Sequence, residues 1–346
     1  MKIDGRLIRS NHPLAPLAPP PPPYIIAEIS GNHGGMQGNA LRLISAAKRA
    51  GADAVKFQAY TADTITLDCN KPDFIMKDGP WAGRKLHELY KKAQTPFSWF
   101  PSLFDKARKD GITPFASVFD RLSVDVLEKL DCPAYKIASF EITDLPLIQY
   151  AGDTWKPLIV STGMAANGEI SAARSSIKGE CEFLHCISGY PTPIEQANLG
   201  RMGQLAAQYG SAGISDHTLG WEIPVAATVM GATIIEKHLC LSRDDDTEDA
   251  SFSLTPPEFK HMVDTVHSVW QAMQPSEAVS QEANRQARRS LYVVRDMNQG
   301  DVFTDKTVRS IRPGYGLLPA MLSTVIGKRA AVAIERGTAL TMDMFR

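Results

Sequence analysis

Eight short apolar stretches recur between residues 24 and 238, and helix-like segments separate them. Strands that are apolar throughout and turn polar at their carboxyl ends are typical of a parallel (β/α)8 barrel, whose active site lies at that rim. The pattern therefore predicts an α/β fold built on a TIM barrel, and an enzyme. The expected strands are Ile25–Glu28, Ala54–Gln58, Pro114–Ser117, Ala134–Ile137, Leu158–Ser161, Glu182–His185, Ala212–Ser215 and Ile234–His238.

Amphipathic helix patterns lie between these strands. They cover Asn39–Ala50, Leu122–Leu130, Glu169–Ile177 and Trp221–Met230, and Gly51 and Gly231 are typical helix stops. Strand, helix and strand recurring at this pace indicate parallel βαβ units.

The chain is longer than a barrel alone requires. Its 346 residues compare with the roughly 250 that (β/α)8 units commonly take. The sequence becomes polar over residues 274–289, and beyond that point Gly300–Thr304 resembles Gly337–Thr341. We expect a proline-rich leader over 1–23 that ends in the polyproline II run Pro19–Pro23, the barrel over 24–274, a linker over 275–287, and a small, mostly β module over 288–346.

Charge and cysteine usage exclude several classes of protein. Lys and Arg total 37 against 38 for Asp and Glu, so the formal charge of -1 gives no field to attract nucleic acid or an anionic membrane. The 5 cysteines have no CxxC spacing, which favours reduced thiols over a disulfide framework or a zinc cluster. No apolar run reaches the roughly 18 residues of a membrane helix, and no signal pattern begins the sequence. We expect a soluble, cytoplasmic protein.

One strand-to-strand connection is about twice as long as the others. It joins Gln58 to the strand that ends at Ser117, and it would project from the carboxyl rim of the barrel. Long loops of this kind are often lids, but an aromatic-rich insertion is also typical of packing between subunits, so both interpretations stay open. Its aromatic residues include Trp81, Tyr90, Phe97, Trp99 and Phe100.

Two histidines end the last two expected strands. Because adjacent barrel strands lie about 4.8 Å apart, His217 and His238 at the same level would reach one ion. Imidazoles without cysteine suit Mn²⁺, Co²⁺, Fe²⁺ or Zn²⁺ with substrate oxygens completing the shell, and such a metal polarises a carbonyl or activates water. The alternative is that each imidazole is a neutral, hydrogen-bonded rim residue.

Two lysines stand inside apolar strands. An ammonium without a partner is costly to bury, so Lys56 and Lys136 indicate an anionic ligand. Each lysine could instead pair with Glu28 or Glu141, or one could form a Schiff base. Hydroxyls at five strand ends would donate to phosphate or carboxylate oxygens without adding charge, and they belong to Ser117, Ser139, Ser161, Ser188 and Ser215.

Carboxylates complete the expected rim. Glu28 follows an apolar strand, where burial raises a carboxyl pKa toward neutrality and suits it to proton transfer, although it could also serve as a lysine partner. The acidic stretch from Asp244 to Asp249 reads as a solvated loop, but it also follows the eighth strand. A carboxylate there would hold sugar hydroxyls or amides.

Seven segments near the strand ends point to one known family. They are Ala27–His33, Lys56–Gln58, Tyr135–Ser139, Ser161–Met164, Tyr190–Pro193, Ser215–Thr218 and Glu236–His238. Together they resemble the sialic acid synthase family, which condenses phosphoenolpyruvate with an N-acetylated amino sugar. The segment Arg288–Phe345, with its Ile311–Gly314, resembles the antifreeze-like (SAF) domain of that family. The resemblance implies a (β/α)8 TIM barrel followed by this small domain.

Three further stretches are similar to the pseudaminic acid synthase branch of the family. They are Thr95–Trp99, Ser139–Asp144, and Ser242–Asp245 with Asp249–Ser253. The resemblance implies 2,4-diacetamido-2,4,6-trideoxy-altropyranose as the sugar. The N-acetylneuraminate and legionaminate branches are the nearer alternatives.

The resemblance also assigns roles by position. It implies that phosphoenolpyruvate is held by Lys56, Ser117, Lys136, Ser139, Ser161, Ser188 and Ser215. It implies a divalent metal on His217 and His238, with Mn²⁺ favoured over Co²⁺ or Mg²⁺. Gln58, Tyr190 and Asp249 would contact the sugar, together with Arg312 from a partner subunit in a domain-swapped homodimer. The chain departs from the family pattern at Ala116, Val118, Ile187 and Gly189, beside the expected phosphate contacts.

The implied reaction is an aldol-like condensation. C3 of phosphoenolpyruvate attacks the sugar aldehyde held at the metal, water adds to C2, and C–O cleavage releases phosphate. Glu28 is the leading candidate for proton transfer, and the lysines stabilise the anionic donor. Two distant alternatives are a Schiff-base sugar-acid lyase acting through Lys136 and a sugar-binding protein without catalysis.

Overall fold

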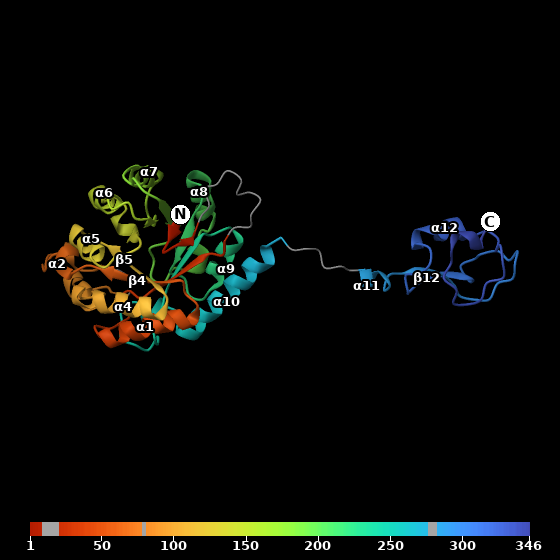
Figure 1. The fold of residues 1–346 in the computed structure, drawn as a ribbon, viewed down its shortest axis with the longest axis horizontal. Helices are drawn as coiled ribbons and strands as arrows, with labels where there is room; N and C mark the ends of the chain where they lie inside the picture. The colour runs from red at the N-terminus through yellow and green to blue at the C-terminus, as the bar shows by residue number, and fades with distance from the viewer. Residues whose placement is uncertain (9–20, 78–80, 276–281) are drawn as a thin grey trace. The chain divides into compact units, whose positions relative to one another are not determined.

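The structure is a computed structural model that describes residues 1–8, 21–77, 81–275 and 282–346 (Figure 1). The chain divides into two compact units, Met1–Gln274 and Pro275–Arg346. Each unit has its own hydrophobic core, and the two are described separately.

Eight parallel strands of the first unit close into a barrel, which confirms the expected fold. In chain order they are β3 (Tyr24–Glu28), β4 (Ala54–Ala59), β5 (Thr113–Val118), β6 (Tyr135–Ile137), β7 (Leu158–Ser161), β8 (Cys181–His185), β9 (Gly213–Asp216) and β10 (Ile234–His238). The barrel closes where β10 pairs with β3, with His238 opposite Glu28. Strand ends far apart in the sequence therefore meet at one rim.

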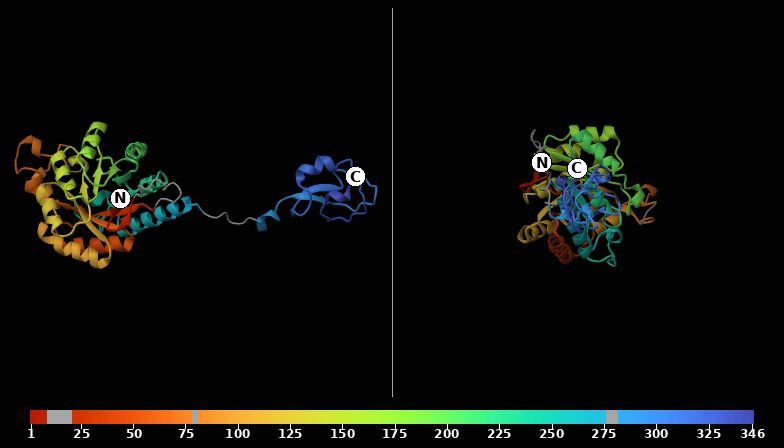
Figure 2. Two further views of the ribbon diagram at one scale, coloured as in Figure 1. Left: turned by 45° about the horizontal axis from the view of Figure 1, so that its top comes forward. Right: turned by 90° about the vertical axis from the view of Figure 1, so that its right-hand side faces the viewer.

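Helices surround this barrel on its outside, as Figures 1 and 2 show. They bury their apolar faces against strands that are apolar on both sides, which is why the strands read as unbroken apolar runs. Gly51 ends the first helix at φ +91°, a conformation that favours glycine. The helices are α1 (Gln37–Ala50), α4 (Phe100–Asp110), α5 (Arg121–Glu128), α6 (Leu145–Gly152), α7 (Asn167–Ser175), α8 (Gly200–Tyr209), α9 (Glu222–Val229) and α10 (Pro256–Met273).

A small hairpin covers the amino-terminal end of the barrel, which sequence reasoning missed. It consists of β1 (Lys2–Ile3) and β2 (Arg6–Leu7). Arg6 pairs with Asp53, just before β4, and Asp4 accepts a hydrogen bond from Thr113 at the start of β5. Ile3 is fully buried in the barrel core. The first eight residues of the expected leader thus fold onto the barrel, while residues 9–20, which include Pro19 and Pro20 of the proline run, lie outside the described residues.

The long connection after β4 folds into short helices. These are α2 (Ala62–Ile65), the 3-10 turn η2 (Pro72–Phe74), α3 (Leu86–Ala93) and η3 (Phe97–Trp99). Its aromatic residues occupy two different environments. Phe97, Trp99 and Phe100 pack on the barrel core, whereas Trp81 and Tyr90 line a cavity at the rim.

The second unit is a small module with an antiparallel pair, β11 (Ser290–Val293) and β12 (Val308–Ile311). Further backbone bridges join residues such as Tyr292 to Ala339 and Ala330 to Phe345. The two similar glycines of the sequence, Gly300 and Gly337, adopt nearly the same φ of +92° and +91°. Its short helices are α11 (Glu282–Arg285), η7 (Pro319–Met321), α12 (Leu322–Val325) and η8 (Met342–Met344).

Within the described ranges, no helix is long and apolar enough to span a bilayer.

Candidate active site

The carboxyl rim of the barrel surrounds one cavity of about 710 Å³, here called the rim cavity. Every site residue expected in the barrel lines it, because inward-pointing positions at the ends of parallel strands converge. Arg312 belongs to the second unit, where it is exposed. The lining residues include Glu28, Lys56, Gln58, Ser117, Lys136, Ser139, Ser161, Ser188, Tyr190, Ser215, His217, His238 and Asp249.

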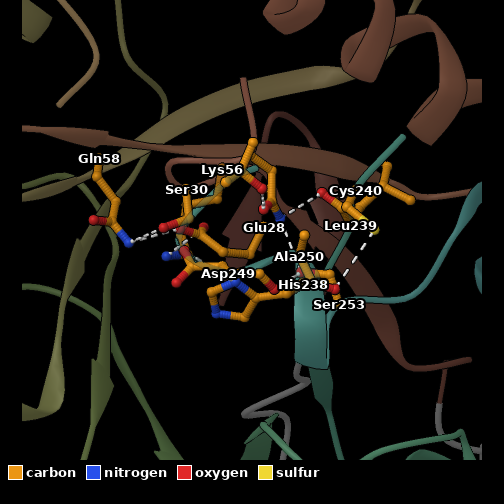
Figure 3. Close-up of polar contacts among 12 residues, drawn as sticks. Glu28, Ser30, Lys56, Gln58, His238, Leu239, Cys240, Asp249, Ala250 and Ser253 are labelled. Carbon is orange, nitrogen blue, oxygen red and sulfur yellow. Dashed lines mark hydrogen bonds and ion pairs between the residues drawn. The ribbon is translucent and has the colours of Figure 1, made fainter. Parts of the chain in front are cut away.

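Two buried ammonium groups share one buried carboxylate at the floor of the rim cavity. Lys56 Nζ and Lys136 Nζ each lie 3.6 Å from Oε1 of Glu236. Lys56 Nζ, on β4, also lies 2.6 Å from Oε2 of Glu28, on the neighbouring strand β3. Figure 3 shows these two side chains. The four side chains are almost fully shielded from solvent. Charge in such a place must be balanced, either within the protein or by a ligand.

The protonation of this cluster is uneven. Burial raises the pKa of Glu28 and lowers the pKa of Lys136. Burial also lowers the pKa of Lys56, but the carboxylates of Glu236 and Glu28 outweigh it and the net shift is upward. For Glu236 burial acts to raise the pKa, but Lys136 and Lys56 reverse the shift. Glu236 is therefore the ionised carboxylate of the cluster, and Glu28 is the one most ready to hold a proton.

Serine hydroxyls surround the lysines. Lys56 Nζ donates to Ser117 Oγ at 3.0 Å, and Lys136 Nζ donates to Ser161 Oγ at 2.7 Å. Ser215 Oγ donates to Glu236 Oε1 at 2.9 Å. Ammonium and hydroxyl donors thus line one end of the rim cavity, which is the chemistry that binds phosphate and carboxylate oxygens.

A glycine allows two more hydroxyls to meet there. Ser139 Oγ and Ser188 Oγ lie 2.9 Å apart. Gly163 follows β7 at φ +41°, and a Cβ at this position would lie 2.5 Å from Ser139 Cβ and 2.9 Å from Ser188 Oγ. A glycine is therefore required for the close approach of these loops.

The two strand-end histidines lie side by side, with ring centroids 5.4 Å apart. His217 Nδ1 is 2.9 Å from the carbonyl oxygen of Ile187, to which it donates, and this leaves the lone pair of Nε2 available to a metal ion. His238 Nδ1 is buried without a hydrogen-bond partner among the described residues. Burial lowers the pKa of both imidazoles and favours the neutral, metal-binding form.

These features fit a divalent metal whose remaining positions are filled by substrate or water. A closed cage is not built here, since the described residues contain no group of three or more His, Cys, Asp or Glu side chains arranged to hold a metal. An open coordination shell is typical of catalytic metal sites.

The side chain of Asp249 lies beside His238, as Figure 3 shows. Asp249 Oδ2 lies 3.8 Å from His238 Nδ1, and burial raises the pKa of Asp249 to about 6. Gln58 Nε2 donates to Glu28 Oε1 at 3.0 Å and to Ser30 Oγ at 2.9 Å. This polar strip connects the lysine floor to the histidine pair.

The segment after β3 is a scaffold for this strip. Asn32 Nδ2 donates to the carbonyl oxygen of Leu239 at 3.0 Å and to Ser253 Oγ at 2.8 Å. Thr247 Oγ1 donates to Asn32 Oδ1 at 2.8 Å. The motif around Asn32 therefore ties the β3 loop to the β10 loop, which carries Asp249.

Comparison with known proteins agrees with this geometry. The NeuB family profile matches residues 43–278, and the SAF domain profile matches residues 288–346. The chain belongs to the NeuB family. Membership confirms the resemblance inferred from the strand-end motifs.

This NeuB-family chain is similar in sequence to pseudaminic acid synthases and to an N,N'-diacetyllegionaminic acid synthase. It is 42% identical to the pseudaminic acid synthase of Campylobacter jejuni subsp. jejuni serotype O:23/36, over 93% of this chain and 96% of that one. It is 39% identical to the pseudaminic acid synthase of Helicobacter pylori, over 93% and 97%. The N,N'-diacetyllegionaminic acid synthase of Legionella pneumophila is 32% identical, over 92% and 94%.

Among solved structures, one match is the N-acetylneuraminic acid synthetase of Leptospira borgpetersenii serovar Hardjo-bovis in complex with citrate. The two chains are 32% identical with a TM-score of 0.68, and the match covers 77% of this NeuB-family chain and 90% of that chain.

The rim cavity of the NeuB-family barrel is also lined by residues outside the expected site set. Glu236 is the clearest case, since it alternates with His238 on β10 and so shares its inward face, while Lys237 points away and pairs with Asp216. The period of two along a strand could have found it. Tyr60 follows β4 directly and continues the alternation of Lys56 and Gln58, so the same period could have found it. Glu141, in the 3-10 turn η4 (Ser139–Glu141), and Glu248, in the loop after β10, also line the rim cavity, but no strand period sets their direction.

Proposed function

We propose that this protein condenses phosphoenolpyruvate with 2,4-diacetamido-2,4,6-trideoxy-altropyranose to give a nine-carbon, sialic-acid-like sugar and phosphate. The observation that carries the proposal is that one cavity holds both a lysine–serine floor for an anion and a pair of neutral imidazoles. The names of its relatives at 42% and 39% identity support this choice of sugar.

The floor of the rim cavity would bind the anionic donor. Lys56 and Lys136 face a ligand whose phosphate and carboxylate together approach three negative charges, and the hydroxyls of Ser117 and Ser161 add donors without adding charge. Fixed donors in a water-poor site stabilise charge more strongly than water does. Ser139, Ser188 and Ser215 complete the proposed donor set.

His217 and His238 would hold a divalent metal, for which we propose Mn²⁺, with Co²⁺ or Mg²⁺ as alternatives. When bound, such an ion supplies a Lewis acid that polarises the sugar carbonyl. Burial raises the pKa of Glu28, which lies beside Lys56. Its carboxyl group would therefore transfer the proton of the attacking water. Gln58, Tyr190 and Asp249 would orient the sugar beside the histidines.

We further propose a domain-swapped homodimer in which Arg312 of a partner subunit reaches the sugar. Two properties support this arrangement. Residues 288–346 carry 10 Lys and Arg against 5 Asp and Glu, whereas the rest of the chain is acidic. Four exposed apolar residues follow β6, β7, β8 and β9 around the rim, where the module of a partner subunit would cover them. They are Phe140, Met164, Ile194 and Leu219.

A substrate panel with phosphate release as the readout tests the reaction. The diacetamido-trideoxy-altrose, its legionaminate-type isomer and N-acetylmannosamine are compared at saturating phosphoenolpyruvate and Mn²⁺. We expect the altro sugar to give the highest kcat/KM. A preference for either of the other sugars would move the protein to the legionaminate or neuraminate branch, and sugar binding without phosphate release would contradict a synthase. In ¹⁸O water, the label should enter the sugar acid, whereas label found in phosphate alone would reject C–O cleavage.

A further inference from the structure

The rim cavity has two chemically different sides. Its floor consists of charged groups and hydroxyls, but the insertion after β4 contributes a side of aliphatic and aromatic groups. This side is here called the apolar wall and consists of Ile65, Met76, Trp81, Leu89 and Tyr90. Three of these side chains have no strong hydrogen-bonding group, and the other two offer one ring N–H and one hydroxyl. The metal and the anionic donor account for the floor, but neither accounts for the wall.

The apolar wall is a built part of the site. Arg84 Nη1 lies 2.8 Å from Glu248 Oε1, and Lys92 Nζ lies 3.4 Å from the same oxygen. Glu248 immediately precedes Asp249, so these pairs hold the insertion to the β10 loop at the sugar side of the site. Gln94 Oε1 accepts a hydrogen bond from Ala62 N at 2.9 Å and closes the insertion on itself.

Aromatic contacts connect the apolar wall to the histidine pair. The ring of Trp81 lies 5.9 Å from that of Tyr190, and the ring of Tyr190 lies 4.5 Å from that of His217. Only one ring therefore separates Trp81 from the imidazole. A sugar whose aldehyde carbon lies at the histidine pair has its far carbons within reach of the wall.

The base of the wall is equally supported. Tyr60 lies edge-on to Tyr90 at 5.7 Å and to Phe119 at 5.1 Å, in the arrangement that aromatic pairs prefer. Tyr60 itself is 2% exposed, so it fixes the ring of Tyr90 without facing solvent.

We infer that the apolar wall is the specificity element that receives the methyl groups of a 6-deoxy, diacetamido sugar, namely the C6 methyl and an acetamido methyl. The wall would disfavour sugars that carry a hydroxyl group at C6. The inference rests on the proposed function and adds the residues that make the choice. Moving each methyl group from water to an apolar surface is favourable. A C6 hydroxyl placed against Ile65, Met76 or Leu89 would lose its hydrogen bond to water without replacing it.

The expected discrimination follows from these terms. One methyl-sized difference in an apolar pocket changes kcat/KM by roughly 10-fold to 200-fold. Loss of the largest wall residue should therefore reduce the preference for the 6-deoxy sugar by about 10-fold or more.

The experiment uses the full-length protein with Mn²⁺ and two sugars that differ only at C6: the 6-deoxy diacetamido sugar and its 6-hydroxy counterpart. For Trp81→Ala and Met76→Gln we expect kcat/KM to fall at least about 10-fold for the 6-deoxy sugar and to change little for the 6-hydroxy sugar, with the KM for phosphoenolpyruvate unchanged. Trp81→Phe should retain most of the preference because it keeps an apolar ring. Trp155→Ala is the matched control, since Trp155 is 70% exposed and does not line the rim cavity.

The outcomes separate the two proposals. If wild type uses the 6-deoxy sugar and Trp81→Ala keeps the same ratio between the sugars, the wall inference is overturned while the proposed reaction stands. If wild type prefers the 6-hydroxy sugar, both are overturned. A variant that loses activity on both sugars equally, with an intact circular dichroism spectrum, would make the wall a structural support and would also overturn the inference.

Discussion

The ammonium of Lys136 lies 3.6 Å from Oε1 of Glu236, the same oxygen that lies 3.6 Å from the ammonium of Lys56. One carboxylate thus lies beside two cations. Oε2 of Glu236 is buried without a hydrogen-bond partner in the described part of the chain. The proposed anionic donor would add negative charge to this cluster, so the role of Glu236 can be tested.

Replacing Glu236 with Gln should lower the stability of the ligand-free protein. Removing one partner of a buried ion pair typically costs about 3–5 kcal/mol, because it leaves the other charge uncompensated. Phosphoenolpyruvate supplies the missing negative charge, so it should raise the unfolding midpoint more in Glu236→Gln than in wild type. Thermal unfolding with and without the donor measures both effects. Glu195→Gln, at an exposed position, is the control, and equal midpoints for the two variants would contradict the shared-carboxylate arrangement.

Binding of phosphoenolpyruvate should take up protons. Burial lowers the pKa of Lys136 from 10.5 and raises that of Glu28 from 4.5, so each group has lost part of its preference for the charged state. A nearby anion favours the protonated form of both, which means that the complex holds more protons than the free protein and that affinity falls as pH rises. Calorimetry at pH 8 in buffers of different ionisation enthalpy measures this uptake, since phosphate monoesters ionise near pH 6. Proton release on binding would reject the assignment.

Much of the barrel was predictable because a single physical property determines it. Strands covered on both faces must be apolar along their whole length, so β3 to β10 were located from sequence and their ends converge as topology requires. The lysine, serine and histidine positions followed from the same rule. Glu236 was missed because only His238 was interpreted as a site residue of β10. The two residues are two positions apart and therefore occupy the same face of the strand.

Other features depend on contacts between distant segments that no local pattern records. The hairpin at Lys2–Leu7 is short and polar, and its place is set by Arg6 and Asp53 across the barrel end. The insertion after β4 was recognised by its length, but its division into core-packing and cavity-lining aromatics depends on ion pairs such as Arg84 with Glu248, which are 164 residues apart.

Gly163 should be required for binding the donor. An alanine there would place Cβ 2.5 Å from Ser139 Cβ and would hold a left-handed backbone, at a cost of about 1–2 kcal/mol for the backbone alone. We expect the KM for phosphoenolpyruvate to rise about 10-fold or more in Gly163→Ala, because 1.4 kcal/mol of lost binding corresponds to a factor of ten. Gly168→Ala is the matched control, since nothing lies within 4 Å of its Cβ position. Unchanged donor kinetics in Gly163→Ala would show that the Ser139–Ser188 contact does not bind the donor.

Metal binding should depend on both strand-end histidines. His217→Ala and His238→Ala each remove one of the two imidazoles, whose rings are 5.4 Å apart, and we expect Mn²⁺ affinity to fall at least about 10-fold. Electron paramagnetic resonance of free Mn²⁺ measures this directly, independently of turnover. His261→Ala, on the outer helix α10, is the control and should bind Mn²⁺ as wild type does. Retained Mn²⁺ affinity in both site variants would place the metal elsewhere.

Arg312 should act on the sugar and, in the proposed dimer, should act from the partner subunit. Arg312→Ala is expected to raise the sugar KM about 10-fold while leaving the KM for phosphoenolpyruvate unchanged, since loss of a hydrogen bond to a charged group costs about 1.5–3 kcal/mol. Arg309→Ala, exposed on β12 of the same module, is the control. The source of the arginine is tested by mixing Arg312→Ala with His217→Ala after dissociation. If the arginine comes from the partner, a mixed dimer contains one site with both His217 and Arg312, and turnover with the wild-type sugar KM returns. If the arginine acts within its own chain, neither site of the mixed dimer is complete, and the mixture keeps the raised sugar KM of Arg312→Ala.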